Sequence, residues 1–125
     1  MPAPRILIVD DDPGILIMLQ LMLQLEGYDA VACDHPSEVL GKIQVEKFDL
    51  MLLDAMMPQL NGLEVLKRMQ DATFPQKPRV ILFTGSSDPS YRKDALQYGA
   101  CDVMSKPFIK EELLARIQTL LGGKS

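Results

Sequence analysis

Residues 5–14 read RILIVDDDPG, an apolar run that stops at three consecutive aspartates and is followed by Pro-Gly. A continuous apolar run of this length is typical of a parallel strand that is covered on both faces. Pro13 suits the first position of a helix. Three neighbouring carboxylates repel one another, and they need either water or a cation to offset that repulsion. The stretch therefore predicts a buried strand, a turn and a helix, with an acidic cluster where the strand ends.

The same alternation of strand and helix patterns continues along all 125 residues. We expect strands at 5–9, 29–33, 48–54, 79–85 and 102–106. We expect helices at 13–26, 34–45, from 63 to at least 69, at 87–99 with Asp88 as cap, and at 108–121. Five such units predict a single α/β domain over residues 1–125, with a frayed tail at about 122–125. The favoured architecture is a flavodoxin-like, doubly wound five-stranded parallel sheet of order 2-1-3-4-5 with helices on both faces.

Composition excludes several classes of protein. The net charge is −4 and no cluster of Lys or Arg occurs, so direct binding to nucleic acid is not expected. The apolar segment 15–19 is broken by Gln20, which leaves no segment long enough to span a membrane. The N-terminal residues 1–5 lack signal-peptide character. Cys33 and Cys101 have no metal-ligand spacing and suggest reduced thiols, so we expect a cytoplasmic protein.

Polar residues close four of the five expected strands. They are Asp10–Asp12, Asp54, Thr84 and Lys106. Because the carboxyl ends of parallel strands share one edge of a sheet, these side chains should meet there. Crowded carboxylates suit Mg²⁺, while lysine and a threonine hydroxyl suit phosphate oxygens. A carboxylate nucleophile beside a metal site, a lysine and a hydroxyl is typical of phosphoryl transfer to an aspartate.

Four motifs in order extend this interpretation. They are ILIVDDDPGI (6–15), LLDAMMPQLNG (52–62), FTG (83–85) and SKPF (105–108). In sequence and spacing the chain resembles the receiver domain of two-component response regulators, including chemotaxis regulators. The resemblance covers essentially the whole chain.

The resemblance implies a role for each residue of the acidic edge. Asp54 would be the phosphoacceptor, and Thr84 and Lys106 would bind the phosphoryl group. The Mg²⁺ ligands would be Asp10, Asp11, Asp54 and the backbone carbonyl of Met56, with Asp11 direct and Asp10 largely through water. The bond between Lys106 and Pro107 would be cis.

The resemblance also implies partners. A sensor histidine kinase or a phosphotransfer protein would donate the phosphoryl group. Phosphorylation would reshape the face made by the fourth helix, fifth strand and fifth helix, which would then bind an output domain or partner protein. The chain would catalyse only its own phosphorylation and dephosphorylation. A homodimer is a further possibility, because the last helix is rich in apolar residues: Ile109, Leu113, Leu114, Ile117, Leu120 and Leu121.

One departure from the family pattern concerns switching. The family usually has Tyr or Phe three residues before the lysine, and this chain has Val103. Valine cannot swing between a buried and an exposed position as an aromatic ring can. Switching would then rely on Thr84 and Gly85 alone, or on Tyr98 or Phe83.

A second departure is Met56, at a position where the family often has a polar residue that orients the attacking water. We therefore expect slow self-dephosphorylation. Met56 also argues against an aspartyl-phosphate phosphatase, which needs an acidic residue there. The alternative function is a phosphorylation-independent interaction module on the same fold. Asp12 is expected at a helix N-terminus, and His35 in a loop, exposed and without partners.

Overall fold

The sheet has five parallel strands in the order β2-β1-β3-β4-β5, which confirms the predicted topology. It is seen in a computed structural model that describes residues 3–57, 61–71, 76–85 and 89–122. Three features expected from the sequence lie outside these residues: Pro58 of the 52–62 motif, the cap at Asp88, and tail residues 123–125.

Strands and helices alternate along the chain. The strands are β1 (Arg5–Val9), β2 (Asp29–Cys33), β3 (Leu50–Asp54), β4 (Arg79–Thr84) and β5 (Asp102–Ser105). The helices are α1 (Pro13–Leu25), α2 (Val39–Val45), α3 (Gly62–Asp71), α4 (Pro89–Gln97) and α5 (Lys110–Leu120). Most bounds agree with the prediction to within two residues.

The largest departure is at the second helix, which was expected over 34–45. The structure has a short 3₁₀ turn at Pro36–Glu38, and the α-helix begins only at Val39. The amide of Glu38 donates to the carbonyl of His35 at 3.0 Å, which is the tighter i to i+3 bond of a 3₁₀ turn. The prediction took this turn for the first turn of the helix.

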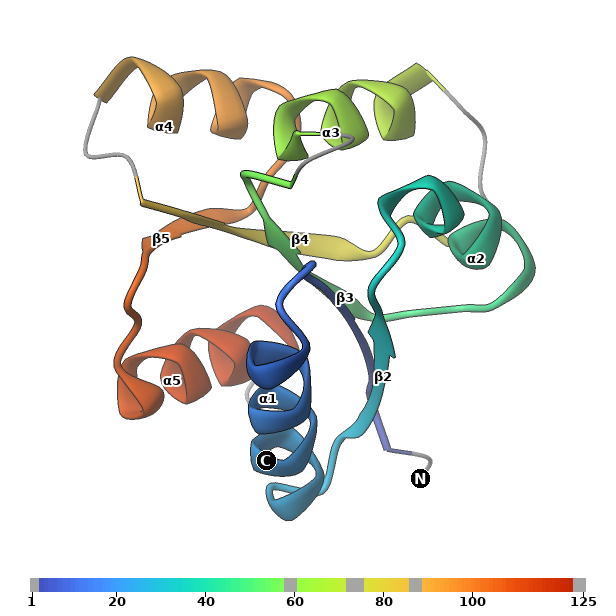
Figure 1. The fold of residues 1–125 in the computed structure, drawn as a ribbon, viewed down its shortest axis with the longest axis vertical. Helices are drawn as coiled ribbons and strands as arrows, with labels where there is room; N and C mark the ends of the chain where they lie inside the picture. Colours follow the sequence, from blue (N-terminus) through green and yellow to red (C-terminus); the bar gives the residue numbers. More distant parts are fainter. Residues whose placement is uncertain (1–2, 58–60, 72–75, 86–88, 123–125) are drawn as a thin grey trace.

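Helices cover both faces of the sheet (Figure 1). Successive residues of a strand point to opposite faces, and β1 shows the consequence. Ile6 and Ile8 pack in the core under α1 and α5, whereas Leu7 and Val9 pack in the core under α2, α3 and α4. Both faces of β1 are thus buried, as its unbroken apolar sequence predicted.

Exposed apolar side chains gather on α1 rather than on the last helix. Ile17, Met18, Leu21 and Leu25 are between 49% and 84% exposed. The last helix was expected to bury one side on the sheet and could have left an apolar stripe for a partner, and of its six apolar residues only Ile109 is largely exposed. The other five are buried or packed against the core: Leu113, Leu114, Ile117, Leu120 and Leu121. Within the described residues, no helix has the length and apolar character needed to cross a membrane.

Candidate phosphoryl-transfer site

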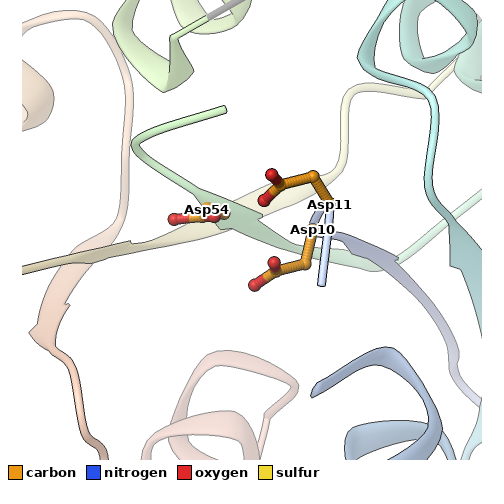
Figure 2. A group of neighbouring side chains, drawn as sticks. All are labelled: Asp10, Asp11 and Asp54. Atoms are coloured by element: carbon orange, nitrogen blue, oxygen red, sulfur yellow. The ribbon is translucent and has the colours of Figure 1, made fainter. Parts of the chain in front are cut away.

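Strand register brings Asp10 and Asp54 together. Val9 pairs with Leu53, so the next residue on each strand emerges at the same level of the sheet. Asp11 follows Asp10 in the chain, and one carboxylate oxygen from each of the three aspartates lies within 4.8 Å of the others. Figure 2 shows these three carboxyl groups gathered where β1 and β3 end. Asp10 and Asp54 are buried, whereas Asp11 is exposed.

Lys106 joins this cluster from the end of β5. Its Nζ donates to Asp10 Oδ2 at 3.0 Å and lies 3.3 Å from Asp54 Oδ1. Burial alone would lower the pKa of Lys106, but the hydrogen bond and charge of Asp10, together with Asp54, raise that pKa above its ordinary value. The lysine is therefore held as a cation between two buried carboxylates.

Asp54 has a raised pKa. Burial is the largest cause, and the charge of Asp10 adds to it; the backbone amide of Met56 and the charge of Lys106 act in the opposite direction. Two buried carboxylates share one lysine, so the site retains excess negative charge. A further cation would offset that charge.

Asp10 is also fixed by the turn that leads into α1. Its Oδ1 accepts a hydrogen bond from the amide of Asp12 at 2.9 Å. Asp12 in turn caps α1, because its Oδ1 accepts from the amide of Gly14 at 2.9 Å. This confirms the prediction that Asp12 belongs to the helix N-terminus. The Asp-Asp-Asp-Pro-Gly sequence thus anchors one Asp10 oxygen to the backbone and leaves the other facing Lys106.

The loop after β3 holds Asp54 from the other side. The amide of Met56 donates to Asp54 Oδ1 at 3.2 Å, and Met56 is 70% exposed. The amide of Gly62 donates to the carbonyl of Ala55 at 2.8 Å, which closes the loop onto the residue after Asp54. Met56 therefore lies beside the carboxylate cluster, where its carbonyl was expected to act as a metal ligand.

Thr84 ends β4, which is the strand next to β3. It is buried, and it pairs with Ser105 of β5, the residue before Lys106. The Lys106 amide donates to the Thr84 carbonyl at 2.9 Å. The bond between Lys106 and Pro107 is cis, as the sequence predicted. The structure thus places all six residues expected at the site along one edge of the sheet.

The residues present fit a Mg²⁺ ion. Mg²⁺ prefers oxygen ligands, takes one or two carboxylates and keeps several waters. The cluster offers two buried carboxylates with excess negative charge and a third that is open to solvent. This donor set is compatible with a metal site.

An apolar cleft of about 720 Å³ leads to this site. It runs between α1 and the segment after β5, and its walls include Met18, Met22 and Phe108. Asp10 and Lys106 also line the cleft. A molecule in the cleft would therefore touch both apolar surface and the charged site.

His35 follows β2 and is exposed, as expected, but it does have a partner. Its Nδ1 lies 2.5 Å from Asp34 Oδ1, so the prediction of a partnerless histidine is wrong. The hydrogen bond with Asp34 raises the pKa of His35, and the charges of Asp34 and Glu38 add to that effect. Adjacent residues in a loop can form such a pair without a signal in the sequence pattern.

Sequence reasoning missed Tyr91 of α4. Its hydroxyl oxygen is buried and has no hydrogen-bond partner within the part of the chain that the structure describes. Burial raises the pKa of Tyr91, and the charge of Asp54 raises it further. Ala95, four residues later on the same helix face, is fully buried. That spacing was the available signal that Tyr91 faces inward.

Sequence reasoning also missed the ion pairs that join α4, β5 and α5. Asp102 of β5 pairs with Arg92 of α4 at 3.4 Å and with Arg116 of α5. Arg92 donates in addition to the carbonyl of Val103 at 2.8 Å. These contacts link three neighbouring elements, one of which, β5, is followed directly by Lys106.

Comparison with known proteins matches residues 6–118 to the response regulator receiver domain. The chain belongs to this family. The receiver domain is 38% identical over 119 residues to the alkaline phosphatase synthesis transcriptional regulatory protein PhoP of Bacillus subtilis, which covers 94% of this chain and 48% of PhoP. It is also 38% identical over 117 residues to the CpxR homolog of Haemophilus influenzae, a match that covers 94% of this chain and 50% of that protein. The chain thus spans about half the length of these curated relatives.

Solved structures agree with this membership. The CheY-like receiver domain protein of Methanospirillum hungatei superposes with a TM-score of 0.87 at 33% identity, over 96% of this chain and 94% of that one. The beryllofluoride-activated NtrC4 receiver domain, described as a dimer, has a TM-score of 0.86 at 29% identity. The match covers 97% of this chain and 98% of that one. Fold and sequence thus both place this chain among the receiver domains of response regulators.

Proposed function

We propose that Asp54 is the residue that accepts the phosphoryl group in this receiver domain. The observation that carries the proposal is the contact of Lys106 with both Asp10 and Asp54 at the ends of three separate strands. A lysine is a mobile point charge suited to phosphate, and here it already lies beside the attacking oxygen. Buried Thr84 lies one residue beyond Phe83, the strand partner of Asp54, and adds a hydroxyl donor.

The reaction is an in-line displacement at phosphorus. A carboxylate oxygen of Asp54 attacks the phosphorus of a phosphohistidine, a new P–O bond forms, and the P–N bond of the donor breaks. The imidazole nitrogen leaves with the electron pair and takes a proton from solvent. Lys106 balances the charge on the phosphoryl oxygens, and Asp10 keeps Lys106 in place.

A Mg²⁺ ion would be held by Asp10, Asp11, Asp54 and the carbonyl of Met56. When bound, it would supply positive charge that stabilises the equatorial phosphoryl oxygens. The protein would prepare for it by fixing Asp10 through the amide of Asp12 and Asp54 through the amide of Met56.

The donor would be a sensor histidine kinase or a phosphotransfer protein, docking on α1. Clusters of exposed apolar side chains are typical of binding surfaces, and this one borders the cleft that Asp10 and Lys106 line. Leu21→Glu should slow transfer from a phosphohistidine protein several-fold and leave labelling by acetyl phosphate unchanged. Val45→Glu, at an apolar residue on α2 that is even more exposed than Leu21, is the control. Equal slowing by both variants would refute this docking surface.

The output surface would be the face formed by α4, β5 and α5. Asp102 connects α4 and α5 through its ion pairs with Arg92 and Arg116. A displacement of one helix would therefore strain the ion pair to the other. An output domain or separate partner protein would bind there, and a homodimer through α5 would use exposed Ile109. We place the protein in the cytoplasm, and we propose that it acts as a switch that turns over only its own phosphoryl group.

The test is intact-protein mass spectrometry after incubation with Mg²⁺ and acetyl phosphate. We expect one added phosphoryl group in the wild type, none in Asp54→Asn, and none after chelation of Mg²⁺. Lys106→Met should label far more slowly than the wild type. If neither acetyl phosphate nor beryllofluoride modifies the wild type, the interaction-module alternative replaces this proposal.

A further inference from the structure

The aromatic ring expected on β5 of a receiver domain is absent here. A tyrosine of α4, Tyr91, lies on the same face of the sheet. Val103 occupies the β5 position and is buried in the core under α2, α3 and α4. Tyr91, from the first turn of α4, packs against this same core. The aromatic group on this side of the site therefore comes from α4 instead of β5.

The other two aromatic candidates have different surroundings. Phe83 packs in the core on the opposite face, edge-on to Phe108 with ring centroids 5.3 Å apart. The ring of Tyr98 lies beyond the end of α4 under the Lys67 ammonium, 4.9 Å from it. Neither offers an unpaired buried donor, whereas Tyr91 does.

An unpaired buried hydroxyl is uncommon because the group loses its hydrogen bonds to water without replacing them. Tyr91 lies in the first turn of α4, the helix that follows β4, and β4 ends beside Asp54 because Phe83 is the strand partner of Asp54. The charge of Asp54 also raises the pKa of the Tyr91 hydroxyl, which keeps this donor protonated. A phosphoryl group on Asp54 would extend from the carboxylate and add three strong acceptor oxygens and more negative charge. An unpaired hydroxyl within reach of such a group can form a charge-assisted hydrogen bond with it.

We propose that the Tyr91 hydroxyl is a hydrogen-bond donor to the phosphoryl group of Asp54, unpaired before phosphorylation and paired after it. This inference rests on the proposed function of Asp54. The new bond would fix the first turn of α4 against the site. Through Arg92, the next residue, it would reach Val103 and Asp102 on β5. Tyr91 would thus bind the phosphoryl group directly and transmit the effect of phosphorylation to the output face.

The first test uses tyrosine absorption, because the chain has three tyrosines and no tryptophan. In a Tyr28→Phe/Tyr98→Phe background, Tyr91 is the only tyrosine. Beryllofluoride with Mg²⁺, a mimic of the phosphoryl group, should shift its absorption to longer wavelength as the phenol becomes a donor. The same background carrying Asp54→Asn should show no shift.

The second test is Tyr91→Phe, with Tyr98→Phe as the matched control. The melting temperature of unmodified Tyr91→Phe should equal or exceed that of the wild type, because the substitution removes an unpaired hydroxyl. Its affinity for beryllofluoride should fall roughly tenfold, the cost of losing one charge-assisted hydrogen bond. Tyr98→Phe should change that affinity less than about twofold. A purely structural role for Tyr91 predicts instead a lower melting temperature and unchanged affinity.

The outcomes separate this inference from the proposed function. Beryllofluoride uptake by the wild type, with no spectral shift and full affinity in Tyr91→Phe, overturns the role of Tyr91 alone. A wild type that takes up no beryllofluoride overturns both proposals.

Discussion

Gly62 packs directly against Ala55, the residue that follows the proposed phosphoacceptor. Its amide donates to the Ala55 carbonyl at 2.8 Å. A Cβ at position 62 would lie 2.6 Å from Leu82 Cδ1 and 3.0 Å from the Ala55 Cα. The start of α3 therefore lies so close to the loop after β3 that only glycine fits there.

Gly62→Ala should destabilise the protein by about 1–3 kcal/mol, the usual cost of forcing an extra methyl group into a packed site. Part of that cost arises because the Ala55 backbone cannot move away without disturbing Asp54. Thermal or denaturant unfolding measures the effect. Gly41→Ala is the control, since a Cβ at position 41 would meet nothing within 4 Å, and alanine there should stabilise α2 by about 0.5–1 kcal/mol. Equal stability of the wild type and Gly62→Ala would contradict the close packing.

Asp54→Asn should stabilise the metal-free protein at neutral pH by about 1–2 kcal/mol. The substitution removes one of two buried carboxylates that share a single lysine, and asparagine still accepts from the Met56 amide. Because the folded state raises the pKa of Asp54, the folded protein keeps this proton to higher pH than the unfolded chain. The destabilisation by Asp54 therefore appears as the pH rises through that raised pKa, and it is absent at acid pH.

Calorimetry at several pH values in the presence of a chelator tests this. The advantage of Asp54→Asn should shrink as the pH falls. Added Mg²⁺ should raise the melting temperature of the wild type more than that of the variant, because ligand binding stabilises the folded state. A variant that is less stable than the wild type at neutral pH would show that Lys106 already compensates both carboxylates.

His35 should titrate with a pKa raised above its ordinary value. Its pKa is raised first by the hydrogen bond with Asp34 and then by the charges of Asp34 and Glu38. A raised folded-state pKa stabilises the protein below the ordinary histidine pKa of about 6.5, and this contribution is lost as the pH rises through the folded value. Since His35 is the only histidine, its ring protons can be followed by NMR without assignment. Asp34→Asn should lower the pKa; an unchanged titration would mean that the pair does not form.

Met56→Asn should shorten the lifetime of the Asp54 phosphoryl group by roughly 10-fold to 100-fold, the range expected for better orientation of a reacting water. The methionine side chain is exposed beside the site and offers no strong acceptor for such a water. Loss of the phosphoryl group is measured by intact mass against time. Val45→Asn, an exposed apolar residue on α2, controls for the change in surface polarity. A variant that loses its phosphate no faster than the wild type would falsify the water-orientation argument.

Much of this architecture could be predicted from local patterns. The apolar run of β1 ends at Asp10 because the strand leaves the sheet there, and helix α1 begins at Pro13 with Asp12 as its cap. Such signals depend on neighbours in the sequence. The convergence of Asp10, Asp54 and Lys106 then follows from parallel topology, since all three stand at carboxyl ends of strands.

Features set by tertiary packing escaped prediction. The buried hydroxyl of Tyr91 and the pairing of Arg116 with Asp102 depend on how α4 and α5 lie on the sheet. The last helix was expected to bury one side and could have left an apolar stripe free, but Leu114 and Leu120 also pack against the core. The exposed apolar surface is on α1. Apolar residues occur on several sides of this helix, so the sequence alone does not show which side is buried and which is exposed.

The bond between Lys106 and Asp10 joins residues that are 96 positions apart. At translation rates of roughly 5–20 residues per second, Asp10 leaves the ribosome roughly 5–20 s before its lysine. During that interval the growing chain carries its acidic residues without the cation that completes the pocket. A prematurely ended chain that lacks position 106 is likewise deprived of it. Only a chain synthesised past Lys106 can complete this pocket, so the order of synthesis itself sets when the proposed phosphoryl acceptor can become competent.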